Sequence, residues 1–207
     1  SRFIKARQKD APSPIFCFTA TAKPDVVEDI RNHFTKRLGV SLDVLAGGVR
    51  RDNLAYEVRA VTPQAKYPEV LRLLQEALRE EGGAIVFCAR QKTVEELAAF
   101  LKDAGLDCGY FHGGMLPTEK RSVQEAFLSG ERRVIAATNA FGMGVDKADV
   151  RLVIHLDTPG SLENYLQEAG RAGRDQDPAR CLLLYDDADL DVQFRLLKNA
   201  RLTQHDI

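Results

Sequence analysis

The sequence predicts an α/β fold in which a parallel sheet carries helices on both faces. Short apolar runs of strand type recur from residue 56 onward, and most of them precede a longer segment with apolar residues at helical spacing. Glycine, proline and capping residues separate these segments. Strands that alternate with amphipathic helices form a parallel sheet through right-handed crossovers, and the helices then cover both faces.

The expected elements of this main unit follow one another in a regular order. Apolar residues within 68–79 share one helical face, and Thr93 and Glu96 have the spacing of a capping box. Ser161 can cap a later helix. The expected strands are 56–61, 84–88, 108–111, 133–137, 152–156 and 181–185, and the expected helices are 68–79, 93–102, 117–128, 161–169 and 187–198.

A shorter segment precedes this unit. Residues 15–19 are typical of a short buried strand, and 41–45 of a second one. Between them, Pro24 begins a helix that should end near Gly39. We therefore expect a strand-helix-strand segment over 1–48, a glycine-rich connector over 49–55, a main domain over 56–190, and the start of a further region over 191–207.

Composition limits the classes of function. The 207 residues are 44% hydrophobic and 29% charged with a net charge of −1, which is ordinary for a globular protein and gives no general basic field. Any contact with nucleic acid must then come from a local patch. No apolar run approaches the length of a membrane span, and no signal peptide opens the chain. The cysteines lack C-x-x-C spacing, which indicates free thiols in a reducing compartment: Cys17, Cys88, Cys108 and Cys181.

Two arginines stand three residues apart after a predicted helix. Arg171 and Arg174 alternate with Gly170 and Gly173. A guanidinium is always charged and planar, and it offers two donors at once, so it suits a phosphoryl group. The alternative is the basic end of an ordinary helix, where the macrodipole favours arginine and glycine often follows.

About thirty residues upstream, an apolar strand over 133–137 opens into a loop with two glycines. Ligands of a parallel sheet gather at the carboxyl ends of its strands, where such loops emerge. Amides next to Gly144 can approach a phosphate, and the carboxylate of Asp146 can accept from sugar hydroxyls. The alternative is an ordinary strand-to-helix loop. The third glycine of the dinucleotide fingerprint is absent, which argues against a Rossmann-type cofactor site.

Together these two segments resemble motifs V and VI of superfamily 2 helicases. Their residues are similar to those of the RecQ family of DNA helicases. A DEAD-box RNA helicase would show histidine and arginine where this chain has Gln167 and Glu168. Neither a phosphate loop of the form G-x-x-x-x-G-K-S/T nor an Asp-Glu-x-His motif occurs. Further similar segments appear in order: 18–22 resembles motif III, 85–90 motif IV, and 110–115 the family's His-Ala-Gly-Leu segment.

The resemblance covers about residues 14 to 190. It implies the second of two RecA-like lobes, a three-layer fold, with the end of the first lobe attached at residues 1–48. It implies an ATP-dependent DNA helicase in the intact protein and an inactive fragment, because ATP and Mg²⁺ would bind chiefly to the first lobe. The implied partners are single-stranded and forked DNA and that first lobe, with no membrane. The implied place is the bacterial cytoplasm or the nucleus, in DNA repair and recombination.

The resemblance also assigns residues. The implied catalytic arginines are Arg171 and Arg174, which would reach the nucleotide together with Gly144, Asp146 and Gln167, and no residue is expected to bind a metal. The implied contacts to DNA are Arg90, His112, Gly113, Thr138 and Asn139, and the implied coupling residues are Thr19 and Thr21.

Several of these assignments keep an alternative. His112 is equally typical of a structural histidine, the two threonines of helix caps, and Asp146 of a turn that bonds its own backbone. We expect His155, Cys88, Phe16 and Phe18 to pack in the interior. For the whole chain, the rival functions are a DEAD-box-like RNA helicase lobe and a nucleic-acid-binding module without catalysis. The connector should correspond to the Asp-Arg-Pro-Asn segment of RecQ proteins, although here its proline is absent.

Overall fold

The computed structural model describes residues 15–18, 24–45, 51–141, 145–187 and 189. The chain divides into two compact units, residues 1–50 and 51–207. This boundary falls within the expected connector, and each unit is described by itself.

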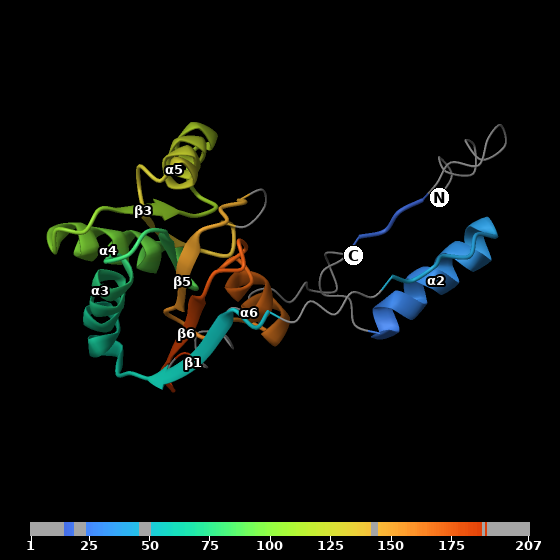
Figure 1. Ribbon diagram of the computed structural model, residues 1–207, viewed down its shortest axis with the longest axis horizontal. Helices are drawn as coiled ribbons and strands as arrows, with labels where there is room; N and C mark the ends of the chain where they lie inside the picture. The colour runs from blue at the N-terminus through green and yellow to red at the C-terminus, as the bar shows by residue number, and fades with distance from the viewer. Residues whose placement is uncertain (1–14, 19–23, 46–50, 142–144, 188, 190–207) are drawn as a thin grey trace, which may run out of the picture. The chain divides into compact units, whose positions relative to one another are not determined.

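The larger unit is built on a six-stranded parallel sheet (Figure 1). Every pair of neighbouring strands is parallel, and the strands lie in the order β1-β6-β5-β2-β4-β3. This confirms the α/β class that the sequence predicts. The strands are β1 (Leu54–Ala60), β2 (Gly83–Phe87), β3 (Cys108–Phe111), β4 (Val134–Ala137), β5 (Val150–His155) and β6 (Ala179–Tyr185).

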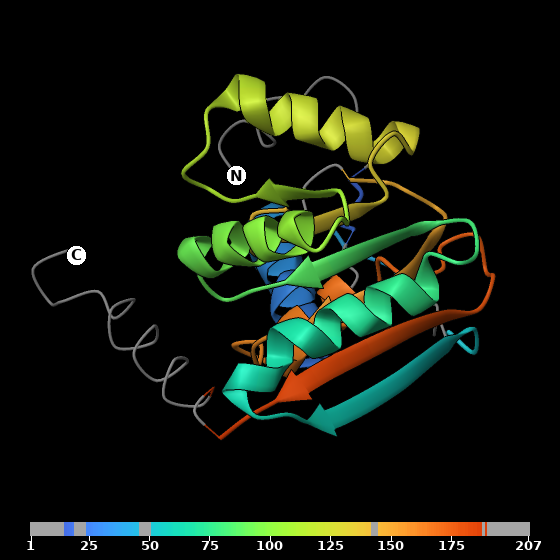
Figure 2. The same cartoon turned by 90° about the vertical axis from the view of Figure 1, so that its left-hand side faces the viewer.

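Helices cover both faces of this sheet and complete three layers (Figures 1 and 2). On one face, α3 (Lys66–Ala77) and α4 (Gln91–Asp103) contribute to one buried apolar cluster. On the other, α5 (Pro117–Ser129) and α6 (Leu162–Ala169) contribute to a second. A short 3₁₀ turn, η1 (Pro63–Ala65), leads into α3. The fold is therefore the predicted three-layer RecA-like arrangement.

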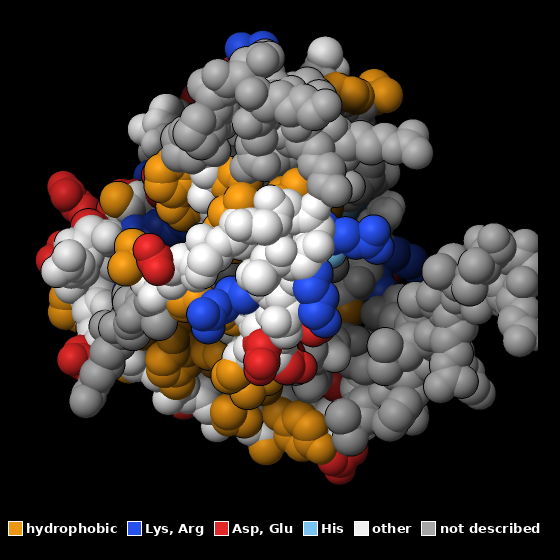
Figure 3. Space-filling view, turned by 90° about the vertical axis from the view of Figure 1, so that its right-hand side faces the viewer, with side chains coloured by type: hydrophobic (Ala, Val, Ile, Leu, Met, Phe, Trp, Pro, Cys, Tyr) orange, Lys and Arg blue, Asp and Glu red, His pale blue; other side chains and the backbone are white. Residues whose placement is uncertain are grey.

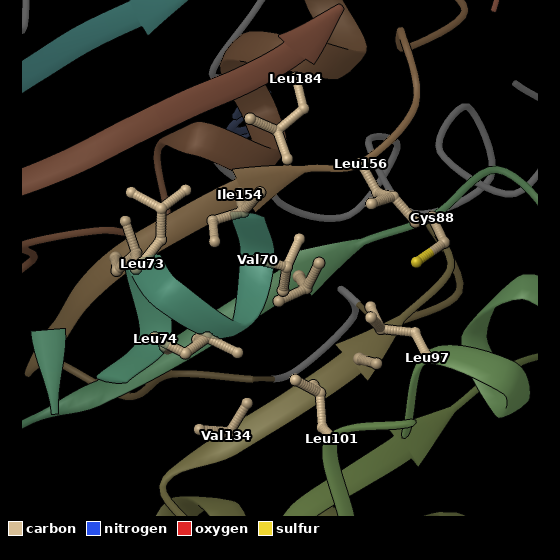
Figure 4. Packing of buried hydrophobic residues seen from close by; sticks show 14 of the residues in the cluster. Val70, Leu73, Leu74, Cys88, Leu97, Leu101, Val134, Ile154, Leu156 and Leu184 are labelled. Atoms are coloured by element: carbon tan, nitrogen blue, oxygen red, sulfur yellow. The ribbon is translucent and has the colours of Figure 1, made fainter. Parts of the chain in front are cut away.

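The alternation of side chains along the central strands creates the two clusters. In β2, Ala84 and Val86 belong to the first cluster, and Ile85 and Phe87 to the second. All four are at most 3% exposed. Figure 4 shows side chains of α3, α4 and the strands pointing toward one another in the first cluster. Each large apolar side chain buried in this way stabilises the fold by roughly 1.5–3 kcal/mol.

The predicted strands and helices of this unit up to residue 185 are present, with shifted boundaries. Ser161 caps α6 as expected, because its Oγ accepts from the Asn164 amide at 3.1 Å. The capping box expected at Thr93 is wrong, since α4 begins at Gln91 and the Thr93 side chain is buried within the first turn. Just before this helix, the amide of Ala89 donates to the Asp157 carboxylate at 2.8 Å.

The smaller unit contains one described helix, α2 (Pro24–Leu38), as predicted. The two strands expected beside it are wrong for the residues that the structure describes, because 15–18 and 41–45 form no regular structure. A strand needs a neighbour to pair its backbone groups, and neither segment has one here. Phe16 and Phe18 stack on each other at 6.2 Å but are 73% and 92% exposed, so their expected packing is also wrong. Apart from residues 187 and 189, the expected helix over 187–198 lies outside the described residues.

A network of charged side chains connects α3 to the edge strand β1. Glu69 accepts from Arg72 at 2.8 and 2.9 Å and forms an ion pair with Arg59 of β1. The Arg72 hydrogen bonds, with a further one from Arg59, lower the pKa of Glu69 from 4.5 to about 2, although partial burial opposes this. A lowered carboxyl pKa means that the charged form stabilises the folded state.

We expect Glu69→Gln to reduce the free energy of unfolding by about 1 kcal/mol at neutral pH, since the exposed Arg72 is screened by solvent. The contribution is fully present above pH 4.5 and is lost as the pH falls through about 2. Urea unfolding of the variant and the wild type should therefore differ less at about pH 3 than at about pH 7. Glu125→Gln is the matched control, because Glu125 pairs with the exposed Arg121. A difference that does not depend on pH would contradict the ion-pair explanation.

Candidate functional site

The five residues predicted to contact nucleic acid lie at one edge of the sheet. Arg90 follows β2, His112 and Gly113 follow β3, and Thr138 and Asn139 follow β4. These three strands are neighbours in the sheet. We call this the carboxyl edge, because the strands end there. The structure thus gathers residues that lie up to about fifty positions apart in the sequence.

Only two of these residues present an exposed side chain, Arg90 and Asn139. Thr138 is 7% exposed, and its Oγ1 accepts from the Ala140 amide at 3.4 Å. The Gly113 carbonyl accepts from Lys120 Nζ at 2.7 Å.

His112 is 5% exposed, and its Nε2 lies 2.9 Å from a carboxylate oxygen of Glu95. Its ring also stacks on Tyr110. These contacts favour the structural alternative for the His112 ring, and they leave Arg90 and Asn139 as the side chains of this edge that a ligand reaches first.

Two polar side chains at this edge, Asp157 and Lys66, were not indicated by the sequence. Asp157, which follows β5, accepts from the Ala89 amide next to Arg90, and burial raises the pKa of Asp157. Lys66 Nζ lies 2.6 Å from Asp189 Oδ1 and donates to the Leu156 carbonyl at 2.8 Å. Both groups hold the ends of β2, β5 and β6 in place.

Two of the residues predicted to bind a nucleotide, Arg174 and Asp146, lie together at the opposite edge, where β5 and β6 begin. Arg174 Nη1 lies 2.5 Å from Asp146 Oδ1 and 3.4 Å from the Val145 carbonyl. The Asp146 side chain is 83% exposed and that of Arg174 is 36% exposed. The structure therefore brings together two residues that the sequence assigned to the nucleotide, on a surface that a ligand can reach.

This placement corrects the expectation that Asp146 lies at the carboxyl ends of the strands. After β4 the chain passes back across the sheet, because β5 is parallel to β4's neighbour β2 and has to begin at the other edge. The Asp175 amide contacts the Ala148 carbonyl at 3.4 Å, and the Gly173 amide donates to Val150, the first residue of β5, at 2.8 Å. We call this second edge the amino edge.

The two arginines are not equivalent. Arg171 is 8% exposed, and burial, with the positive charge of Arg174, lowers its pKa while Glu168 opposes this. Gln167 lies exposed in the last turn of α6, whereas Glu168 turns inward and contacts His155 Nε2 at 2.9 Å. The expected packing of His155 is confirmed, since it is 1% exposed. Arg174 is thus the more accessible of the two guanidiniums.

Gly144, Thr19 and Thr21 lie outside the described residues. Within the described ranges, no group of three or more His, Cys, Asp or Glu side chains is placed to hold a metal ion. None of the helices in the described part of the chain combines the length and apolar composition that a bilayer crossing requires. Basic and acidic side chains are interspersed on the surface that Figure 3 shows, in keeping with the net charge.

A turn over 170–178 carries Arg171 and Arg174, and Gly173 is essential to it. Gly173 has φ 52°, a conformation that side chains disfavour. An added Cβ would lie 2.5 Å from Asn53 Nδ2 and 2.7 Å from the Asp177 carbonyl. The close approach of Asn53 shows that the connector packs directly on this turn. Sequence reasoning missed Arg51 and Asn53 as residues that contact this turn.

Residues 65–176 match the family model described as the helicase conserved C-terminal domain. The chain belongs to this helicase family. Its relatives confirm the resemblance to RecQ. It is 37% identical over 206 residues to the ATP-dependent DNA helicase RecQ of Haemophilus influenzae, covering 99% of this chain and 32% of that protein. It is 36% identical over 200 residues to the RecQ-like DNA helicase blm-1 of Caenorhabditis elegans, covering 97% of this chain and 20% of that protein.

A solved structure confirms the fold of this helicase domain. The E. coli DEAD-box protein SrmB, in its structure bound to regulator of ribonuclease activity A, matches with a TM-score of 0.58 at 28% identity, over 68% of this chain and 84% of that one. DEAD-box and RecQ-type domains thus share this architecture, and the sequence likeness marks the present chain as a helicase C-terminal domain of RecQ type. The chain spans between a fifth and a third of the length of the two RecQ-type relatives.

Proposed function

We propose that this domain is the second motor lobe of an ATP-dependent DNA helicase, and that it supplies arginines to ATP bound between it and a first lobe. The observation that carries the proposal is the accessible Arg174 guanidinium, paired with Asp146 at the amino edge. Residues 1–48 would be the end of that first lobe. The isolated chain would not hydrolyse ATP, because it lacks the phosphate-loop lysine.

The pairing of Arg174 with Asp146 suggests how the site changes when nucleotide binds. A phosphate oxygen would compete with Asp146 for the same guanidinium, since both are anionic acceptors. Asp146, once released, could accept from a ribose hydroxyl. Arg174 donors would then stabilise the negative charge that develops as the γ-phosphate leaves. Arg171, held in a buried position beside it, would add positive potential to the same region.

Magnesium neutralises phosphate charge when it is bound in such enzymes. The described residues do not fit it, because they place no cluster of ligands for a metal. We therefore assign the ion to the first lobe and give this domain no part in holding it.

The carboxyl edge supports a contact with single-stranded DNA. Arg90 and Asn139 offer an exposed guanidinium and amide at the ends of two neighbouring strands. Such groups bind phosphates without reading bases, which suits movement along any sequence. Unwinding of forked DNA, with a role in repair and recombination in the bacterial cytoplasm or the nucleus, would follow from this activity. The DNA helicases among the relatives favour DNA over RNA as the substrate.

The DNA part of the proposal is tested by Arg90→Ala in the full-length protein. We expect weaker binding to single-stranded DNA, by a similar factor for all base sequences, because a phosphate contact carries no base information. The slope of log affinity against log salt should fall by about 0.7, the value for one phosphate contact on a single strand. Hydrolysis of ATP at saturating DNA should stay near normal.

Arg121→Ala is the matched control, since Arg121 is also exposed but lies on α5, paired with Glu125 at 2.8 Å. Fluorescence anisotropy of labelled oligonucleotides at several salt concentrations measures both variants. An unchanged salt slope for Arg90→Ala would make Arg90 a structural residue, and a loss that depends on base sequence would indicate base readout.

A further inference from the structure

Two connector side chains hold the turn that carries the arginines. Arg51 Nη2 donates to the Ala172 carbonyl at 2.6 Å and to the Gly173 carbonyl at 2.7 Å. Asn53 Nδ2 donates to the Gly173 carbonyl at 2.8 Å and to the Asp177 carbonyl at 2.9 Å. Arg51 Nε also contacts Asn53 Oδ1 at 3.3 Å, so the two side chains support each other.

Two of the carbonyls that accept these hydrogen bonds lie between the two arginines. Ala172 and Gly173 are the two residues between Arg171 and Arg174. They lie in the turn that follows α6, which ends at Ala169. The Gly173 carbonyl also accepts from the Gln176 amide of the same turn at 3.0 Å, so the connector donors add to a hydrogen bond within the turn. A guanidinium can donate to two carbonyls at once from a planar fork, which fixes direction as well as distance.

The connector is itself firmly placed where it makes these contacts. The Asn53 carbonyl accepts from the Ala179 amide at 2.9 Å, and the next residue, Leu54, begins β1 in register with Ala179 of β6. The turn is anchored on another side by the Gly173 amide, which donates to Val150. The arginine turn is thus held between the start of β5 and the connector.

The connector is also where the chain passes from residues 1–50 into the larger unit. A displacement of this segment would act on the carbonyls of Ala172 and Gly173 through the Arg51 and Asn53 side chains, with no further residue between them. Nothing in the composition of the turn requires this arrangement, because water could satisfy the same carbonyls at an exposed loop.

We propose that Arg51 and Asn53 are positioning residues, which hold the turn so that Arg174 meets the γ-phosphate and which link the connector to the arginines. This proposal rests on the proposed role of Arg174 in hydrolysis. Arg51 and Asn53 would not touch the nucleotide. Their loss should therefore lower the rate of the chemical step and leave the binding of ATP and of DNA in place.

The test compares Arg51→Ala, Arg51→Lys and Arg51→Ala/Arg174→Ala in the full-length protein with wild type and Arg174→Ala. We expect Arg51→Ala to lower DNA-stimulated kcat by about 10- to 100-fold, the cost of a small misplacement of a catalytic group. The KM for ATP and the affinity for single-stranded DNA should change less than about threefold. Arg51→Lys keeps the charge but lacks the fork, and it should recover part of kcat. Arg59→Ala is the control, because Arg59 is also a partly buried arginine but pairs with Glu57 and Glu69.

The double variant separates this proposal from the proposed function. If Arg51 acts through Arg174, the kcat of Arg51→Ala/Arg174→Ala should be only slightly lower than that of Arg174→Ala. The positioning role would be overturned if Arg51→Ala lowered kcat by the same factor in the wild type and in Arg174→Ala. It would also be overturned if Arg51→Lys and Arg51→Ala both kept a kcat within about twofold of wild type. An Arg174→Ala variant with normal hydrolysis would instead overturn the proposed function. If Arg51→Ala does not fold, Asn53→Ala and Arg51→Lys carry the same comparison, with thermal unfolding as the check.

Discussion

Arg174→Ala in the full-length protein should reduce DNA-stimulated ATP hydrolysis by about 10³–10⁵-fold, the range that such arginines contribute to phosphoryl transfer. The affinity for ATP should change little, because the guanidinium donors matter most as charge develops on the γ-phosphate. Its pairing with Asp146 also means that part of any ground-state attraction to ATP is offset by a lost ion pair. Steady-state hydrolysis and fluorescent-nucleotide binding measure the two quantities separately.

Arg180→Ala is the matched control for this prediction. Arg180 lies on β6 and is 38% exposed, close to the 36% of Arg174, and it also pairs with carboxylates, those of Glu57 and Glu76. Its removal should leave hydrolysis unchanged. If Arg174→Ala instead lost nucleotide affinity at a normal turnover number, Arg174 would bind the ground state and would not stabilise the transition state.

Phe141→Ala should lower the free energy of unfolding by about 3–5 kcal/mol, the usual cost of truncating a buried phenylalanine. Phe141 is 0% exposed, and its ring packs edge-on against Phe111 at 5.0 Å and Phe127 at 5.8 Å. These rings come from β3 and α5, so the substitution leaves a cavity lined by two elements that have little freedom to close it. Urea unfolding followed by circular dichroism measures the change.

Asn139→Ala is the control for Phe141→Ala within the same segment. Asn139 is exposed, and its replacement should change the stability by less than about 0.5 kcal/mol. A loss below about 1 kcal/mol for Phe141→Ala would show that the cavity collapses or that the ring contributes little. The comparison assigns the aromatic residue of motif V to the core, where it anchors the segment that goes on to Asp146.

Much of the larger unit was predictable from the sequence, because its signals are local and periodic. The run from Ala84 to Phe87 is apolar throughout, as a strand buried on both faces requires, and Ser161 caps its helix as its residue type indicates. The strands expected at 15–19 and 41–45 had a similar apolar pattern but no partner within the described chain. Whether a segment forms a strand depends on a neighbouring strand as well as on its own residues. The sequence of one segment does not show whether such a neighbour exists.

The candidate site was predictable in its chemistry and less so in its geometry. The motifs indicated Arg174 and Asp146 by residue type, but not that the chain returns across the sheet before Asp146. The sequence makes His112 a possible phosphate ligand, but in the structure its Nε2 contacts the Glu95 carboxylate. Arg51 contacts a carbonyl 121 positions away. A hydrogen bond between such distant positions leaves no periodic trace, so only the folded structure reveals it.

In the motor lobe that we propose, the separation of the two edges would constrain how force is transmitted. β5 joins them through six residues, which corresponds to about 20 Å of extended backbone. A close-packed sheet between two helical layers has low compressibility and cannot shorten along its strands. A displacement at the arginine turn must therefore arrive at Arg90 as a rotation or translation of the lobe as one rigid body. The distance moved along DNA would then be set by the swing of the hinge that joins the lobes, and side-chain changes at either edge would alter grip or rate without altering the length of the step.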